Sequence, residues 1–429
     1  MGNSCVSPCV EFCPECISKR CCKYSSTVMD EEMLQKPQAP LRIRHVPVGS
    51  MVRIYKQDPS IDALGVRMKW LPVNIDNGPS SNDIVIRGLR EPVRPSDNER
   101  NFLYHPSRDD VQFDAVNAFA VVSSVLHMYR RALHRLGVNR NLQWQWGDDP
   151  IRVYPRAGEL ANAMYSRQHR SLVFYYFKDP ETKNYVYTAR SFDIVAHETG
   201  HAILDSLKPN YIGSSNPETG ALHESFGDLT SIFAILSDLE MCEAVIAHSK
   251  GNLHNHSFFS VIGEEFGKAL GRNFGLRNAD ENLRIDEVST EVHDLSRVFT
   301  SAVYDILVDM YDLSRDVEKF NPAETLFRVG KHLISIFIIA FVKAPSRDCR
   351  FRDVANNMIK EEKVKEYRSA MVRQFEFRKI RNLRLEAQLV EHLARKHVCG
   401  TMQVPTDEHL ALVVEQTCSF PQLLPESAI

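Results

Sequence analysis

The chain has 429 residues, of which 43% are hydrophobic and 25% are charged, and its formal net charge is -3. This composition is typical of a soluble protein with room for two or three domains, and the charge gives no reason to expect nucleic-acid binding. No basic segment followed by an apolar one opens the chain, so we expect a cytoplasmic protein. The longest apolar run, 333–342, is too short to span a bilayer and predicts a buried helix.

The first 40 residues are predicted to form a flexible tail rich in cysteine. Three interpretations remain open: reversible S-acylation beside a membrane, a small zinc site that uses Cys13 and Cys16, and redox chemistry. Myristoylation of Gly2 fits less well, because the pattern requires Ser or Thr where the chain has Val6. Disulfides fit poorly in a reducing cell. The six cysteines proposed for acylation are Cys5, Cys9, Cys13, Cys16, Cys21 and Cys22.

Residues 41–110 predict a small β-rich region, because short β-like runs at 51–55 and 84–86 alternate with prolines and turns. The spacing of the apolar residues then changes. Apolar residues recur every three or four positions from Val111 to Leu136, which predicts a long core helix that Gly137 closes. The following strand candidates are residues 151–154, 172–177 and 185–188.

The next helix is predicted at 191–207, where Ser191 can act as its cap and Pro209 ends it. It carries two histidines four residues apart, and this spacing places His197 and His201 on one face. Neutral imidazoles are good zinc ligands, and a catalytic zinc keeps an open position for water. Glu198 would lie beside that position and accept the proton of the water.

A second helix, predicted around 220–229, can supply the third zinc ligand. Glu224 and Asp228 share one of its faces. Glu224 can complete the zinc site, and Asp228 can accept the second ring N–H of His197 and fix its orientation. Gly227 has no side chain, which would let the two helices approach closely. If they occurred alone, these two carboxylates would more often be surface charges. Because they follow the first motif, they favour a metal site.

These two motifs resemble those of the thermolysin family, which belongs to the gluzincin metallopeptidases. The resemblance covers residues 110–345. It implies an α+β fold with a mixed, β-rich N-terminal lobe, a helical C-terminal lobe and a zinc cleft between them. One zinc ion would be held by His197, His201 and Glu224, and peptide bonds would be hydrolysed by a zinc-activated water with Glu198 as the general base.

Further stretches resemble segments that contact the substrate in that family. His293 takes the position of the side chain that stabilises the oxyanion. Asn162 and Ala163 match the edge strand that pairs with the backbone of the substrate. Arg277 matches an arginine that holds a substrate carbonyl, and Tyr211 matches a second oxyanion donor. The implied partner is therefore a peptide or protein substrate.

The chain departs from the family in two respects. The resemblance implies a secretion signal and a long inhibitory pro-segment, but the sequence before the catalytic part is too short for such a pro-segment. The resemblance also implies calcium, and Asp193 matches one calcium ligand, but Ile235 stands where its usual partner on the second helix would be. We therefore expect zinc without calcium, and the departures agree with an intracellular protein.

The region from Lys343 to Lys396 has fifteen Lys or Arg against eight Asp or Glu. Its apolar residues keep helical spacing, which predicts one long helix that packs on the catalytic body and exposes a basic face. The alternative is contact with an anionic membrane surface, which would agree with an acylated tail and a peripheral membrane protein. The predicted parts are a Cys-rich tail (1–40), a β-rich region (41–110), a mixed catalytic lobe (111–207), a helical catalytic lobe (208–345) and a basic helical extension (346–429).

Two other functions stay open. The first is a zinc-containing but catalytically inactive scaffold or binding protein with the same fold; against it, Glu198 is present, and a structural zinc site does not need such a residue. The second uses His254, Asn255 and His256, with the cysteine tail, to handle a metal. No companion ligands lie near these histidines at metal spacing, so the sequence favours surface residues.

Overall fold

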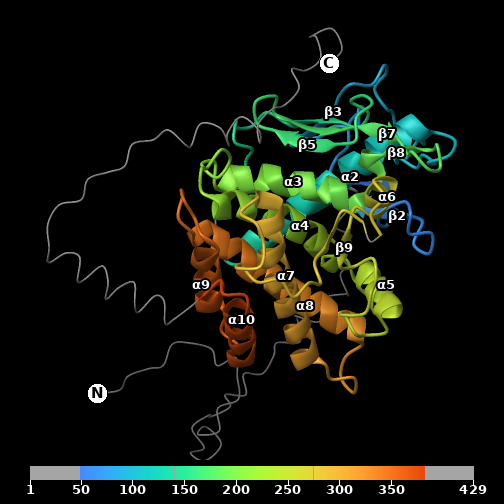
Figure 1. The fold of residues 1–429 in the computed structure, drawn as a ribbon. Helices are drawn as coiled ribbons and strands as arrows, with labels where there is room; N and C mark the ends of the chain where they lie inside the picture. The colour runs from blue at the N-terminus through green and yellow to red at the C-terminus, as the bar shows by residue number, and fades with distance from the viewer. Residues whose placement is uncertain (1–48, 139–141, 274, 382–429) are drawn as a thin grey trace, which may run out of the picture. The chain divides into compact units, whose positions relative to one another are not determined.

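The computed structural model describes residues 49–138, 142–273 and 275–381. All of them belong to one of the two compact units of the chain, Val48–Ile429. The predictions for the cysteine tail and for the basic region beyond residue 381 lie outside the described residues. Within the described part, helices combine with several small sheets, which confirms the predicted α+β class (Figure 1).

The strands form small sheets. Their bounds are β1 (Ser50–Tyr55), β2 (Val66–Leu71), β3 (Ile84–Ile86), β4 (Ile151–Tyr154), β5 (Ala163–Ser166), β6 (Ser171–Phe174), β7 (Tyr176–Lys178), β8 (Tyr185–Tyr187), β9 (Val261–Ile262) and β10 (Arg277–Asn278). The largest sheet has the order β3-β4-β6-β5, and β5 runs antiparallel to β6. The pairs β1-β2, β7-β8 and β9-β10 are antiparallel. Since β5 pairs only with β6, it is an edge strand.

The helices make up most of the core. Their bounds are α2 (Asp110–Arg135), the 3-10 helix η2 (Thr188–Arg190), α3 (Phe192–Leu207), α4 (Pro217–Leu236), α5 (Leu239–Ser249), α6 (Glu264–Ala269), α7 (Val292–Ser314), α8 (Pro322–Lys343), α9 (Phe351–Glu361) and α10 (Lys365–Phe377). α3 packs on β5 at one side and on α4 at the other, so it lies where the four-stranded sheet meets the helices (Figure 1).

Two helices, α2 and α8, are long and apolar enough to cross a membrane by length and composition alone. However, 78% of the apolar window of α2 and 72% of that of α8 are buried inside the protein. They contact each other, and α8 also packs on α5, α7 and α9. Their apolar side chains are therefore used by the core, as the period of three to four residues predicts.

The single strand predicted at 172–177 is wrong, because Tyr175 separates β6 from β7. The carbonyl of Tyr175 accepts hydrogen bonds from the N–H of Thr188 at 3.1 Å and from its hydroxyl at 2.8 Å. Its N–H donates to the carbonyl of Asn162 at 3.3 Å. These bonds lead the chain from the four-stranded sheet into the β7-β8 hairpin.

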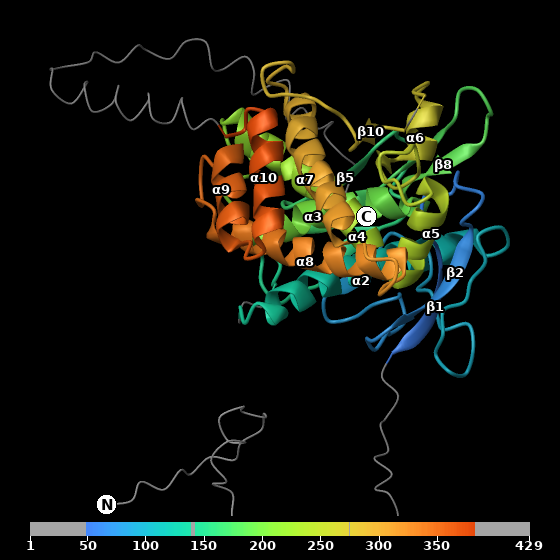
Figure 2. The ribbon, with the colours of Figure 1, turned by 90° about the horizontal axis from the view of Figure 1, so that it is seen from below.

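The long C-terminal helix is also a wrong prediction, since two helices, α9 and α10, occupy this region and turn at Glu362. One oxygen of the Glu362 carboxylate accepts the N–H of Val364 at 2.7 Å, while the other lies 2.8 Å from Nε2 of His332. Both helices pack on the body, because Phe299 of α7 contacts Phe351 and Phe375 (Figure 2). The exposed residues of this segment include the basic Lys363, Lys365, Arg368 and Arg373 and also the acidic Glu366 and Glu376.

Ser191 lies at the start of α3, but its side chain makes no capping bond. Its hydroxyl donates to Asp58 at 2.9 Å and also to Asp193, whose other oxygen accepts the N–H of Gly263 at 2.6 Å. Asp193 thus ties the first turn of α3 to the loop before α6. Ile235, which stands where the resemblance would require a second calcium ligand, is buried and apolar.

Four acidic residues gather at the start of α3, and their repulsion should make the stability of the protein depend on pH. Burial and the charge of Asp58 raise the pKa of Asp193 to about 6 and those of Glu264 and Glu265 to about 7. These carboxyls then bind more protons in the folded chain than in the unfolded chain between about pH 4.5 and 7, so their contribution to stability falls as pH rises through this window.

We expect the melting temperature of Glu264→Gln to rise relative to that of wild type as the pH increases from 5 to 8, because the variant has one carboxylate fewer to ionise in this cluster. Glutamine has a similar shape but carries no charge at either pH. Thermal unfolding followed by circular dichroism at several pH values measures the effect, with the exposed Glu181→Gln as control. An identical pH profile for wild type and Glu264→Gln would contradict the repulsion described above.

Candidate metal centre

α3 and α4 approach each other through glycines. A Cβ atom on Gly227 would lie 2.7 Å from Cε1 and Nδ1 of His197, and one on Gly200 would lie 3.1 Å from Cα of Gly227. Neither position can carry a side chain without movement of the neighbouring helix or of the imidazole. The absence of a side chain at Gly227 therefore lets the His197 ring fit between the two helices, as predicted from the sequence.

Three side chains of α3 and α4 converge on one point. Nε2 of His197 lies 3.6 Å from one carboxylate oxygen of Glu224, and Nε2 of His201 lies 3.6 Å from the other. A tetrahedral zinc ion with bonds of about 2.0–2.1 Å separates its ligand atoms by about 3.3 Å. Two imidazoles and one carboxylate at this spacing fit a zinc ion after a shift of a few tenths of an ångström.

Glu198 belongs to the same cluster. One of its carboxylate oxygens and one nitrogen of each histidine, His197 and His201, all lie within 4.8 Å of one another. By distance alone, Glu198 could also be a ligand. We assign that role to Glu224, because its two oxygens face the two Nε2 atoms, while the carboxylate of Glu198 accepts the backbone N–H of Tyr165.

The orientation of His197 is fixed by a buried ion pair. Its Nδ1 lies 2.9 Å from Oδ1 of Asp228, which is almost completely buried. Arg277 donates to the same carboxylate through Nε at 2.9 Å and holds it ionised. The Nδ1–H of His197 therefore donates to Asp228, which leaves Nε2, the nitrogen that faces Glu224, as the one that can bind a metal. This is the hydrogen bond predicted from the spacing of Glu224 and Asp228.

The orientation of His201 depends on a residue that the sequence interpretation missed. Nδ1 of His201 lies 2.7 Å from Nδ1 of His223, which is buried. If Nε2 of His201 faces the metal, its Nδ1–H donates to His223. Nε2 of His223, which then carries the proton, is buried and has no hydrogen-bond partner among the described residues. The only sequence signal for this role is the position of His223 directly before Glu224.

The electrostatics of the cluster favour two of its ligands in the protonation states that bind metal. Burial raises the pKa of Glu224, but the nearby histidines outweigh it and hold this pKa well below its usual range. Burial lowers the pKa of His201 well below its usual value. An ionised carboxylate and a neutral imidazole are the ligating forms. For His197, burial is outweighed by hydrogen bonds to Asp228 and Glu224, which raise its pKa to about 10, so a proton competes with a metal there.

The edge strand β5 runs beside Glu198. Because the N–H of Tyr165 points away from the sheet toward Glu198, the alternation of a strand places the backbone of Ala163 on the same outer edge. Asn162 precedes it, is exposed, and accepts the N–H of Ala163 on its side-chain oxygen at 2.9 Å. Asp205 anchors the strand to α3, since it accepts the hydroxyl of Tyr165 at 2.6 Å. An extended peptide that adds to this edge would take the N–H of Ala163 from the side chain of Asn162.

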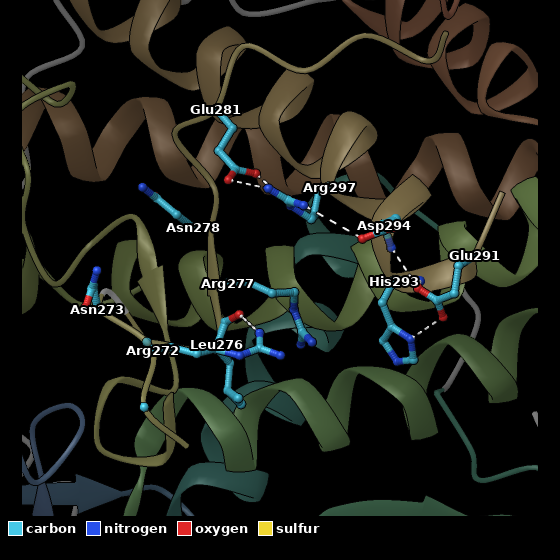
Figure 3. Close-up of a pocket in the computed structure, with 12 residues that line it drawn as sticks. Arg272, Asn273, Leu276, Arg277, Asn278, Glu281, Glu291, His293, Asp294 and Arg297 are labelled. Carbon is cyan, nitrogen blue, oxygen red and sulfur yellow. Dashed lines mark hydrogen bonds and ion pairs between the residues drawn. The ribbon is translucent and has the colours of Figure 1, made fainter. Parts of the chain in front are cut away.

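A polar pocket of about 870 Å³ opens beside the cluster, and His293 and Arg277 line it. Both side chains extend toward α4, where Nε2 of His293 lies 3.6 Å from Oε2 of Glu224 and Arg277 contacts Asp228 (Figure 3). Glu291, at the start of α7, holds the ring through a 2.7 Å contact with Nδ1 of His293. Glu291 was not identified from the sequence, although it lies two residues before His293.

Tyr211 does not take the predicted position of an oxyanion donor. Its side chain is 1% exposed, and its hydroxyl donates to the carbonyl of Pro345 at 2.8 Å. It packs the loop after α3 against the loop after α8. The position of Tyr211 in the sequence did not predict this contact, because the conformation of the loop between α3 and α4 determines where Tyr211 packs.

The chain was also compared with known proteins. No protein-family model matches it, and no curated protein sequence matches it. Any assignment of function therefore depends on the residues themselves and on the geometry of the cluster.

Proposed function

We propose that this protein is a zinc-dependent endopeptidase with a thermolysin-like fold of two lobes, in which the cluster between α3 and α4 is the catalytic centre. The observation that carries the proposal is the convergence of His197, His201 and Glu224 at 3.6 Å separations, with Glu198 beside them. The outer edge of β5 passes the same point. A metal site that served only structure would need neither Glu198 nor an open edge strand.

The residues of the cluster have two separate roles, metal binding and proton transfer. His197, His201 and Glu224 would hold the ion, which when bound supplies a Lewis acid and a water of lowered pKa. Glu198, whose pKa burial and the charge of Glu224 raise to about 7, accepts a proton from the attacking water and later gives it to the departing amine.

The neighbouring residues would bind and polarise the substrate. The outer edge of β5 at Ala163 pairs with the backbone of an extended peptide, so recognition depends on backbone more than on side chains. His293 faces the space above Glu224, where its ring N–H can donate to the carbonyl oxygen that becomes negative. Arg277 keeps Asp228 ionised and lines the adjoining pocket.

Metal analysis and proteolysis together test the proposal. Purified protein should contain one zinc ion that depends on Glu224, and it should cleave unstructured substrates such as casein. A zinc chelator should stop cleavage, and added zinc should restore it. Zinc-loaded protein that cleaves neither casein nor a mixed peptide library would favour the scaffold instead. Zinc that is unaffected by Glu224→Ala would show that the site itself is wrong.

Gly227→Ala should lower the affinity for zinc while the protein still folds. The added methyl group would lie 2.7 Å from the ring of His197, so the imidazole must turn away from Glu224. We expect zinc affinity to fall at least 10-fold, as when the partners of a ligand are lost, and stability to fall by about 1–3 kcal/mol from overpacking.

Gly330→Ala is the matched control for this change. Its methyl group would lie 2.7 Å from Cβ of Leu236 at another close contact between helices, where no metal ligand is present. It should cost similar stability and keep the zinc. Isothermal titration of the zinc-free proteins and thermal unfolding measure both effects. Equal zinc affinity in wild type and Gly227→Ala would contradict the placement of His197.

A further inference from the structure

A second group of metal-binding side chains comes together away from α3 and α4 in the fold. His254 lies in the loop after α5, Asp280 follows β10, and Asp305 lies within α7. One potential ligand atom from each lies within 4.8 Å of the other two, and Nδ1 of His254 is 2.8 Å from Oδ1 of Asp280. His254 has no companion ligands near it in the sequence, because Asp280 and Asp305 come from later segments of the chain.

One carboxylate of this group is buried and only partly satisfied. Asp305 is 7% exposed, and one of its oxygens accepts a hydrogen bond from the buried Arg378 at 2.6 Å. Its other oxygen, Oδ1, is buried and has no hydrogen-bond partner among the described residues. Buried polar atoms without partners are rare and costly, and a bound ion or water commonly explains them.

The backbone around the group is held in place before any ligand binds. The carbonyl of Leu253 accepts the hydroxyl of the buried Tyr304 at 2.7 Å, which fixes the chain next to His254. The N–H of Asp280 donates to the side chain of Asn278 at 3.0 Å. The loops that carry His254 and Asp280 are therefore positioned against α7, which carries Asp305.

The charges of the group leave a negative excess. With His254 neutral, as metal binding requires, Arg378 offsets the charge of Asp305 and the charge of Asp280 remains. A divalent cation would compensate the remaining charge.

We propose that His254, Asp280 and Asp305 bind a divalent first-row transition-metal cation in a second metal site. One imidazole and two carboxylates suit ions such as Mn²⁺ and Zn²⁺. The side chain of His254 is 51% exposed, so the ion has a path to solvent and positions for water. The ion would join the loop after α5, the segment after β10, and α7, so its main effect would be on stability. This inference does not depend on the proposed peptidase activity.

Manganese binding to the full-length protein tests this site. Zinc-loaded protein is titrated with Mn²⁺, and free Mn²⁺ is counted by electron paramagnetic resonance. Zinc binds more tightly than manganese to a given site, so it keeps Mn²⁺ out of the α3–α4 centre. We expect one bound Mn²⁺ per chain and a higher melting temperature in its presence. If the purified protein already contains two zinc ions, the second zinc ion is measured in place of the bound Mn²⁺.

Variants decide whether the ion is at the predicted place. His254→Ala changes a half-exposed side chain, so the protein should fold, and it should bind the ion at least 10-fold more weakly. Asp305→Asn should do the same, and His256→Ala, in the same loop, should bind it as wild type does. Glu224→Gln should weaken zinc at the first centre and leave this ion in place. The proposal is overturned if no ion binds, or if His254→Ala binds the ion as tightly as wild type does. His254 and Asp280 would then be only a hydrogen-bonded pair.

Discussion

Glu198→Gln should lower the rate of peptide hydrolysis by about 10²–10⁴-fold and leave the zinc content unchanged, because Glu198 transfers protons and does not hold the metal in our assignment. Glutamine keeps the size of the side chain and can still accept the N–H of Tyr165 on its amide oxygen. It cannot take a proton from water. The loss should appear in kcat, since the edge of β5 and the pocket that bind the substrate are unchanged.

Glu264→Gln is the matched control, because Glu264 and Glu198 are both 8% exposed and have pKa values raised to about 7. The control should hydrolyse casein as wild type does at a pH where both proteins are fully folded. Metal analysis and thermal unfolding confirm that Glu198→Gln is folded and loaded. Cleavage that survives both this substitution and chelation would come from a contaminating protease.

The two helices that carry the cluster, α3 and α4, were predictable from sequence because the geometry within each helix is local. An i, i+4 spacing places His197 and His201 on one face wherever the helix lies, and the same holds for Glu224 and Asp228. The contact between the two helices is not local, but Gly227 indicated it. Once α3 and α4 touch at Gly227, the 3.6 Å separations follow with little freedom.

The residues that orient these ligands were harder to predict. His223 and Glu291 lie close in sequence to residues that were identified, but a histidine or a glutamate has many roles on a helix surface. Only the packing of α3 on α4 brings His223 to His201, and the spacing of these two residues does not indicate the contact. Glu291 reaches His293 locally, because its side chain caps the start of α7.

Long-range contacts also explain the second cluster and the wrong predictions. His254 meets Asp280 and Asp305 only because the loop after α5 folds against α7. The helical period beyond residue 343 was correctly recognised, yet it did not show where the chain turns. At that turn the buried Glu362 binds the N–H of Val364 and Nε2 of His332 on α8, and Glu362 has no special signature in the sequence.

His293→Ala should lower kcat by about 10²–10³-fold and leave the zinc in place, which is the size expected for the loss of one oxyanion donor. Nε2 of His293 lies 3.6 Å from Glu224, but the side chain is 57% exposed and contributes little to packing. The alanine variant should therefore fold normally. His134→Ala, an exposed histidine at the end of α2, is the control and should keep full activity.

Glu291→Gln separates positioning of the ring from its direct action. The glutamine oxygen can still accept the backbone N–H groups of His293 and Asp294 that Glu291 caps at 2.9 and 3.0 Å, so α7 should remain stable. The neutral amide is a weaker partner for the ring than a carboxylate. We expect a smaller loss of kcat than in His293→Ala, and little further loss when both changes are combined, because both act through one ring. If the double variant loses the product of the two single effects, Glu291 acts independently of His293 and does not work by holding its ring.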